Sequence, residues 1–141
     1  MSLTGLSQFD VTVHATSLWL KELMGRLGWE DRHRAYQALR AVLHALRDHL
    51  TVDEVATLGA QLPLLIRGIY YEGWHPADKP LRERKKEQFL AHIASAFPAN
   101  LGIDAEEVAR AALEVLTAHV TGGEVRGIQH VLPAEIRSLL P

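Results

Sequence analysis

RAVLHALRDHLTVDEVATLGAQLPLLIR (residues 40–67) reappears in altered form as RAALEVLTAHVTGGEVRGIQHVLPAEIR (residues 110–137) when the chain is compared with itself at an offset of 70 residues. The two stretches align without a gap and are identical at 12 of 28 positions. Unrelated sequences would share about two, so the chain contains an internal duplication. This duplication predicts that residues 31–70 and 104–140 form the same arrangement of helices and superpose.

Apolar residues at helical spacing predict the long helices. A first helix over about residues 8–26 is expected, capped by Ser7, with an apolar face made of Phe9, Val13, Leu20, Leu23 and Leu27. A second begins near Asp31 and carries the core residues Leu39, Leu43, Leu46 and Leu50. Its counterpart begins near Asp104 and carries Leu113, Leu116 and Val120. Gly28 and Gly102 are expected to end the preceding helices.

Two shorter helices follow in each copy. Thr51 and Glu54, like Thr121 and Glu124, have the spacing of a capping box. The Leu-Pro pairs at 62–63 and 132–133 then predict a break before a final short helix. The expected fold is all-α: one domain over residues 1–141, with copy one at about 8–70, a connector at about 71–82 and copy two at about 83–141 packed as one bundle.

The composition excludes several classes of protein. The 141 residues are 48% hydrophobic and 23% charged, carry a net charge of -2, and include no cysteine, which excludes disulfides and thiolate chemistry. No apolar run reaches the roughly 20 residues that cross a bilayer. MSLTGLSQFD lacks the features of a secretory signal, so no membrane association and a cytoplasmic location are expected.

No motif indicates a catalytic residue or a cofactor. The chain has eight histidines but no HExxH, and His44 and His49 are five residues apart, so we expect no metal site. The duplicated pairs His49/His119 and Arg67/Arg137 favour structural roles: histidines that close long helices, and arginines that pair with the capping-box glutamates. The segment RERKK (82–86) is expected to form a solvated first helical turn, since Glu83 and Glu87 offset its charge.

A basic stripe on one helix is the first candidate binding surface. His33, Gln37, Arg40, His44 and Arg47 recur at spacings of three and four, whereas the second copy has mostly acidic residues there. We expect His33, Arg40, His44 and Arg47 to face solvent and to bind an acidic partner or a second copy of the chain, more strongly when the histidines are protonated near pH 6.

The second candidate surface is the connector. It begins with YYEGWHPADKP (residues 70–80), and the chain has no duplicate of it after residue 71. Pro76 and Pro80 keep the flanking helices separate, and Gly73 suits a turn. We expect Trp74 to pack across both copies, with a ligand-stacking or partner-anchoring ring as the alternative. A groove between the copies would be lined by Tyr70, Tyr71, Trp74, His75 and Arg67.

The duplicated Leu-Pro-x-x-Ile-Arg element, together with YYEGWHPADKPLRERKKEQFL (70–90), resembles the prokaryotic proteins catalogued as domain of unknown function 2267. The resemblance covers nearly the whole chain from about residue 8. It implies a small bacterial or archaeal helical protein with a binding or regulatory role, and it implies no activity, cofactor or catalytic residue.

Three hypotheses about function follow. The first is a non-enzymatic interaction or regulatory domain that binds a protein partner or itself; a flat apolar or charge-complementary face would favour it. The second is a small-ligand-binding protein or enzyme that uses a polar groove between the copies. DNA binding is a minor alternative, because the helix at residues 62–67, LPLLIR, is mostly apolar and unsuited to reading bases. Nucleic acid is therefore an unlikely partner.

Overall fold

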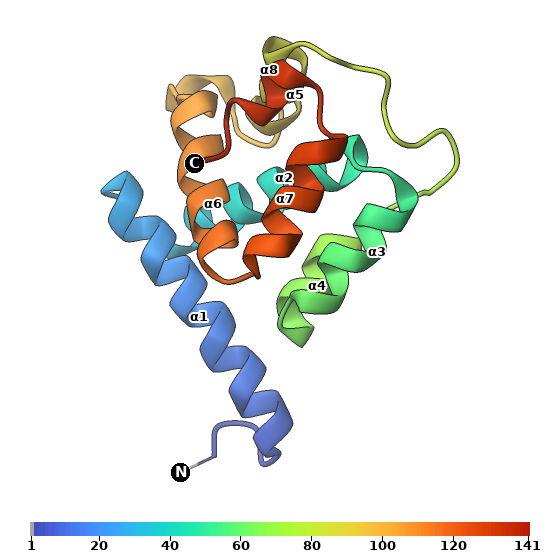
Figure 1. Cartoon of the computed structure of the whole chain (residues 1–141). Helices are drawn as coiled ribbons and strands as arrows, with labels where there is room; N and C mark the ends of the chain where they lie inside the picture. Colours follow the sequence, from blue (N-terminus) through green and yellow to red (C-terminus); the bar gives the residue numbers. More distant parts are fainter. Residues whose placement is uncertain (1) are drawn as a thin grey trace.

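The structure, a computed structural model, describes residues 2–141 and is built of α-helices (Figure 1). The elements in chain order are α1 (Ser7–Leu27), α2 (Arg32–His49), α3 (Val52–Gln61), α4 (Leu64–Tyr71), α5 (Lys86–Ala94), the short 3₁₀ helix η1 (Ala99–Leu101), α6 (Ala105–Ala118), α7 (Gly122–Val131) and α8 (Ala134–Arg137). Residues 2–141 contain no strand, which confirms the all-α prediction. Within that range, no helix has the length and apolar character needed to cross a membrane.

The predicted helix starts are confirmed by side-chain caps. Asp31 accepts a hydrogen bond from the backbone N–H of Arg34, and Asp104 accepts two from the first turn of α6. Thr51 and Thr121 each accept from the backbone N–H three residues on, at 3.2 Å in both cases. These bonds satisfy amide groups that have no partner inside the helix. Gly28 ends α1 in the left-handed conformation, at φ 67°.

The Leu-Pro breaks adopt nearly the same backbone in both halves. Leu62 has φ -85° and ψ 143°, and Leu132 has φ -82° and ψ 143°. Each following proline occupies the N-cap position, where its missing N–H leaves no hydrogen bond unmade. The order α2–α3–α4 is thus repeated as α6–α7–α8, while superposition of the two halves stays a prediction.

The core lies around α2, which packs against α1, α4, α5 and α6. The five leucines that the apolar stripes assigned to the core are each about 1% exposed: Leu39, Leu43, Leu46, Leu113 and Leu116. Burial of each contributes about 1.5–3 kcal/mol relative to an exposed side chain. The burial of these five leucines therefore agrees with the prediction that they form the core faces of the two long helices.

The amino-terminal half of α1 differs from the prediction. Phe9 is 49% exposed, and the buried residues of α1 are Thr12, Thr16, Trp19, Leu20 and Leu23. In Figure 1 this end of α1 reaches past the other helices, so few partners cover it. Ser7 is not the cap either, because the N-cap is Leu6 and makes no side-chain bond. Asp10 instead accepts hydrogen bonds from Ser2 and Thr4, which lower the pKa of Asp10.

The connector runs without helix from residue 72 to residue 85. Gly73 has φ 75°, which fits its predicted turn. The backbone N–H of Leu81 donates to the carbonyl of Asp48 at 2.8 Å, so the connector is fastened to the end of α2. Since α5 begins only at Lys86, the expected helical turn over RERKK is wrong. That segment is extended, and its side chains alternate between solvent and the protein.

Candidate functional site

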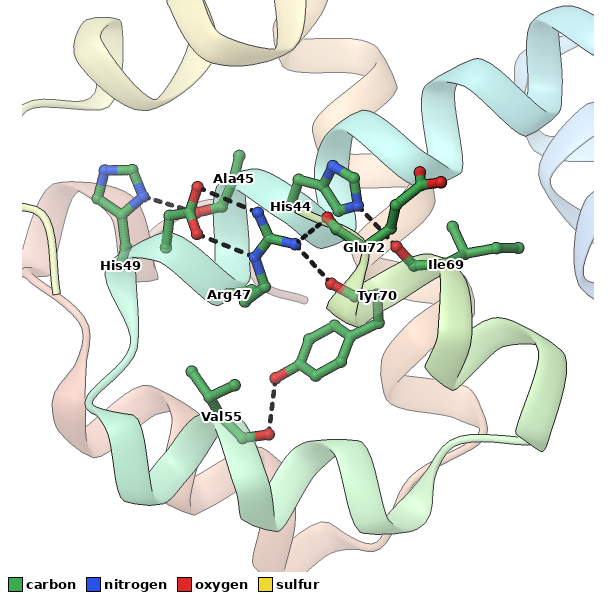
Figure 2. A network of polar contacts seen from close by, with 9 residues as sticks. His44, Ala45, Arg47, His49, Val55, Ile69, Tyr70 and Glu72 are labelled. Atoms are coloured by element: carbon green, nitrogen blue, oxygen red, sulfur yellow. Dashed lines mark hydrogen bonds and ion pairs between the residues drawn. The ribbon is translucent and has the colours of Figure 1, made fainter. Parts of the chain in front are cut away.

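The predicted basic stripe lies on α2 but does not form a free surface. Arg47 is only 4% exposed, and its guanidinium donates to the backbone carbonyls of Tyr70 and Glu72 at 2.7 and 2.8 Å (Figure 2). His44 bonds the carbonyl of Ile69 at 2.7 Å, and Arg40 forms an ion pair with the Glu72 side chain at 2.7 Å. The stripe therefore caps the carboxyl end of α4, whose last carbonyls would otherwise lack partners.

This placement contradicts the predicted solvent exposure of Arg47, whereas binding of an acidic partner by the stripe stays a prediction. Burial lowers the pKa of His44, and the charges of Arg47 and Arg40 act in the same direction, against the hydrogen bond to Ile69. His44 thus resists the protonation that the prediction required. Of the four residues, only His33 is fully exposed, where its ring stacks beside Tyr36 at 6.2 Å.

The aromatic residues at the start of the connector pack on α3. Tyr70 is fully buried and donates to the carbonyl of Val55 at 2.9 Å, and burial raises its pKa. The Tyr71 hydroxyl lies so close to Gly59 that a Cβ there would approach it to 2.3 Å. Trp74 is half-buried beside Tyr71, with ring centroids 5.8 Å apart. Packing of Trp74 across both copies stays a prediction, and His75 is exposed.

Arg67 and Arg137 do not pair with the capping-box glutamates. Each donates from Nη2 to the carbonyl that ends the preceding helix, Arg67 to Leu62 and Arg137 to Leu132, both at 2.9 Å. The residue after that carbonyl is proline, so the chain turns there and the arginine satisfies the exposed acceptor. The predicted structural role is correct in kind, but the partners are backbone carbonyls.

The glutamates Glu54 and Glu124 instead face each other where α3 packs on α7. Burial, with the hydrogen bond and charge of Glu54, raises the pKa of Glu124 to about 8. Two ionised carboxylates would repel each other, and Glu54 Oε1 and Glu124 Oε1 are buried without a donor from any other group. A proton held by Glu124 resolves this conflict.

A second polar group lies where α2, the connector and α5 meet. His49, 2% exposed, bonds the carbonyl of Ala45 through Nδ1 at 2.6 Å and Glu83 Oε1 through Nε2 at 3.0 Å. His92 contacts the same Glu83 oxygen through its own Nε2 at 2.7 Å. Although burial opposes it, the hydrogen bonds from His92 and His49 hold the pKa of Glu83 below its usual value. We call these three residues the His–Glu–His group.

The His–Glu–His group borders a cavity of about 670 Å³, which we call the connector cleft. It lies between the end of α2, the connector and the turn from α7 to α8, and it is lined by His49, Asp78, Lys79, Pro80, Leu81, Arg82, Glu83, Arg84, Val131 and Pro133. Its lining therefore combines the basic residues Lys79, Arg82 and Arg84 with the acidic residues Asp78 and Glu83.

A second cavity, of about 580 Å³, is the groove between α1 and α4, here the α1–α4 groove. Its lining is mainly apolar: Phe9, Val13, Tyr36, Leu64, Leu65 and Ile69, with Thr4, Thr12, Gly68 and Glu72 at its margins. Neither this groove nor the connector cleft is lined by any of the five residues expected around an inter-copy groove, Arg67, Tyr70, Tyr71, Trp74 and His75.

Sequence reasoning missed Glu83 and His92. Glu83 was treated as a charge that offsets its basic neighbours, because RERKK was read as part of a helix. The alternation of basic and acidic residues over 82–84 was the available signal: in an extended chain it turns Glu83 to the face opposite Arg82 and Arg84. His92 carries no local signal, since its two partners lie in other segments.

Comparison with known proteins supplies a family. The model of a family described as "Uncharacterized conserved protein (DUF2267)" matches residues 16–139, which include every helix from α2 to α8 and most of α1. A search of curated proteins finds no match to the chain. Because the family model covers most of its length, the chain belongs to the DUF2267 family of uncharacterized conserved proteins.

Proposed function

We propose that this protein is a non-enzymatic interaction domain that associates with a second copy of itself through the α1–α4 groove. The observation that carries the proposal is where the exposed apolar side chains gather. Seven of the nine large hydrophobic residues that are exposed within residues 2–141 lie before or on α1 or on α4: Leu3, Leu6, Phe9, Val11, Leu18, Leu64 and Leu65. An apolar surface concentrated in this way is typical of a protein interface.

A second copy suits this surface because the surface offers both parts of a contact. The groove presents Phe9, Leu64 and Leu65, while Val11 and Leu18, seven residues apart on one face of α1, are exposed outside the lining of the groove. A two-fold pairing would place the exposed helix of each copy over the groove of the other and cover both. The groove carries no free basic or acidic array, since its Glu72 is paired with Arg40.

Sedimentation equilibrium of the untagged full chain tests the proposal. We expect a dimer for the wild type and a monomer for Phe9→Glu and for Leu64→Glu, because each places a charge in the apolar contact. Leu101→Glu is the matched control: Leu101 is 39% exposed but lies on η1, outside the groove, so this variant should remain a dimer.

The monomeric variants should keep the wild-type helix content by circular dichroism, because both substituted side chains are already largely exposed. A wild type that stays monomeric would contradict self-association. Dimers that persist in both groove variants would place the interface elsewhere.

A further inference from the structure

The contacts of His49 aim one of its ring nitrogens at a carboxylate. A backbone carbonyl can only accept a hydrogen bond, so the 2.6 Å contact with Ala45 places a proton on Nδ1. Nε2 then faces Glu83 Oε1 at 3.0 Å, and His92 faces the same oxygen from the other side at 2.7 Å.

We propose that the His–Glu–His group is a binding site for a divalent transition metal of the zinc type. Its three ligand atoms are the Nε2 atoms of His49 and His92 and a carboxylate oxygen of Glu83, and they all lie within 4.8 Å of one another. Two imidazoles and one carboxylate are a common ligand set for Zn²⁺ with one position left open. The family description assigns no such site.

The spacing of the ligand atoms suits a small ion. Zn²⁺ bonds of about 2.0–2.1 Å in a tetrahedron separate neighbouring ligand atoms by about 3.3 Å. The contacts from Glu83 to His49 and His92, at 3.0 and 2.7 Å, are shorter by about 0.3 and 0.6 Å, and the two Nε2 atoms lie within 4.8 Å of each other, so the side chains must shift to admit the ion. Glu83 lies on the connector and His92 is partly exposed, so both can make that shift.

The surroundings of His49 suit a metal ligand. The His49 side chain is fully buried, so its ring is held in one position. The bond from Nδ1 to Ala45 is also the arrangement that orients metal-binding histidines, because it fixes the ring and leaves Nε2 free. His49 and Glu83 both border the connector cleft, from which a water molecule or an anionic ligand could reach the open position.

Isothermal titration of the untagged, chelator-treated full chain with ZnCl₂ tests this site. We expect one Zn²⁺ per chain and a loss of affinity of at least about 100-fold in His92→Ala and in Glu83→Gln, since each removes a ligand. Both positions lie outside the buried core, so these variants should fold. His75→Ala is the matched control, because His75 is exposed on the same connector and should bind as the wild type does.

A second measurement distinguishes a metal ion bound at Nε2 of His49 from a proton on the same atom. Nitrogen-15 NMR of the imidazole rings should show that saturating Zn²⁺ leaves the proton on Nδ1 of His49 and that Nε2 carries none. The melting temperature should rise on the order of 10 °C at a hundredfold excess over the dissociation constant. Failure to bind Zn²⁺, binding that is equal in His92→Ala and the control, or a proton retained on Nε2 would each overturn the proposal.

Discussion

His49 and His119 occupy equivalent positions in the duplicated sequence, and each packs on an aromatic ring and bonds a glutamate, yet the two differ in burial and in their other contacts. His49 ends α2 inside the protein, bonded to Ala45 and Glu83. His119 follows α6 near the surface, stacks on Trp19 with centroids 4.8 Å apart, and bonds Glu22 of α1 at 2.8 Å. Each histidine keeps its place at the end of a long helix, but only the ring of His49 bonds a carbonyl of its own helix and shares its glutamate with a second histidine.

The two halves share the bonds between residues that are close in the sequence, but not the contacts of Arg47. Threonine caps and arginine-to-carbonyl bonds recur in both halves at nearly the same distances, because each is made within about five residues of sequence. The Arg47 contacts occur once, since the equivalent residue is Thr117, which bonds only carbonyls of its own helix. Duplication thus preserves these local interactions, while the contacts of Arg47 are specific to one half.

The largest expected effect tests this asymmetry at Arg47. Arg47→Ala should lower the free energy of unfolding by about 3–5 kcal/mol, because the carbonyls of Tyr70 and Glu72 lose their buried donor. Thr117→Ala, its equivalent, should cost less than about 1 kcal/mol. Urea unfolding measures both, and Arg47→Met separates lost packing from lost hydrogen bonds. Similar losses for Arg47→Ala and Thr117→Ala would remove the distinction.

Glu54 and Glu124 should make the stability of the protein depend on pH. In the unfolded chain Glu124 releases its proton near the ordinary value of 4.5, whereas in the folded protein it holds the proton up to about pH 8. The free energy of unfolding should therefore fall as the pH rises from about 5 to about 8, by on the order of 2–3 kcal/mol in total. The fall is smaller than the full pKa shift would give, because water that enters the site solvates the ionised carboxylate.

Glu124→Gln keeps the shape of the side chain without its ionisation, so this slope should flatten and the variant should exceed the wild type in stability above pH 8. Thermal melts across this range measure the effect. An unchanged slope in the variant would show that other groups cause it. Burial lowers the pKa of His44, so His44 is a second group that could contribute to the pH dependence; His44→Gln serves as a control and should leave the slope largely intact.

The smallest effect sharpens the comparison at the shared caps. Thr51→Ala should cost about 1 kcal/mol through loss of its bond to the Glu54 N–H. Thr121→Ala should cost up to about 0.5 kcal/mol more, since Thr121 also accepts a bond from Gln61 at 3.1 Å. Thr121→Ala made in a Gln61→Ala background should bring the two costs together. If the two substitutions still differ widely in cost in the Gln61→Ala background, the two threonine caps are not equivalent.

The sequence predicted what depends on neighbours in the chain. Asp31, Asp104 and the threonine caps are correct because a cap and its target lie within one turn. The core leucines are correct because their spacing selects one helix face. Phe9 shows the limit, since its spacing indicates an apolar face but not whether another element covers it.

The candidate sites were less predictable for the same reason. His49, Glu83 and His92 come from α2, the connector and α5, and only the folded chain brings them together. The stripe on α2 was correctly identified as one face, but three of its side chains contact the end of α4, which the spacing did not indicate. Periodicity identifies which side chains point the same way, and it does not identify what they meet.

The capping of α4 by α2 also determines how this protein can open. An eight-residue helix is well below the roughly 12–15 residues at which isolated helices become marginally stable. Its last carbonyls are held by Arg47 and His44, so α4 should exchange its amide hydrogens together with α2, as one cooperative unit. One wall of the α1–α4 groove therefore exists only while the central helix is docked, and the fraction of molecules able to associate follows the global folding equilibrium.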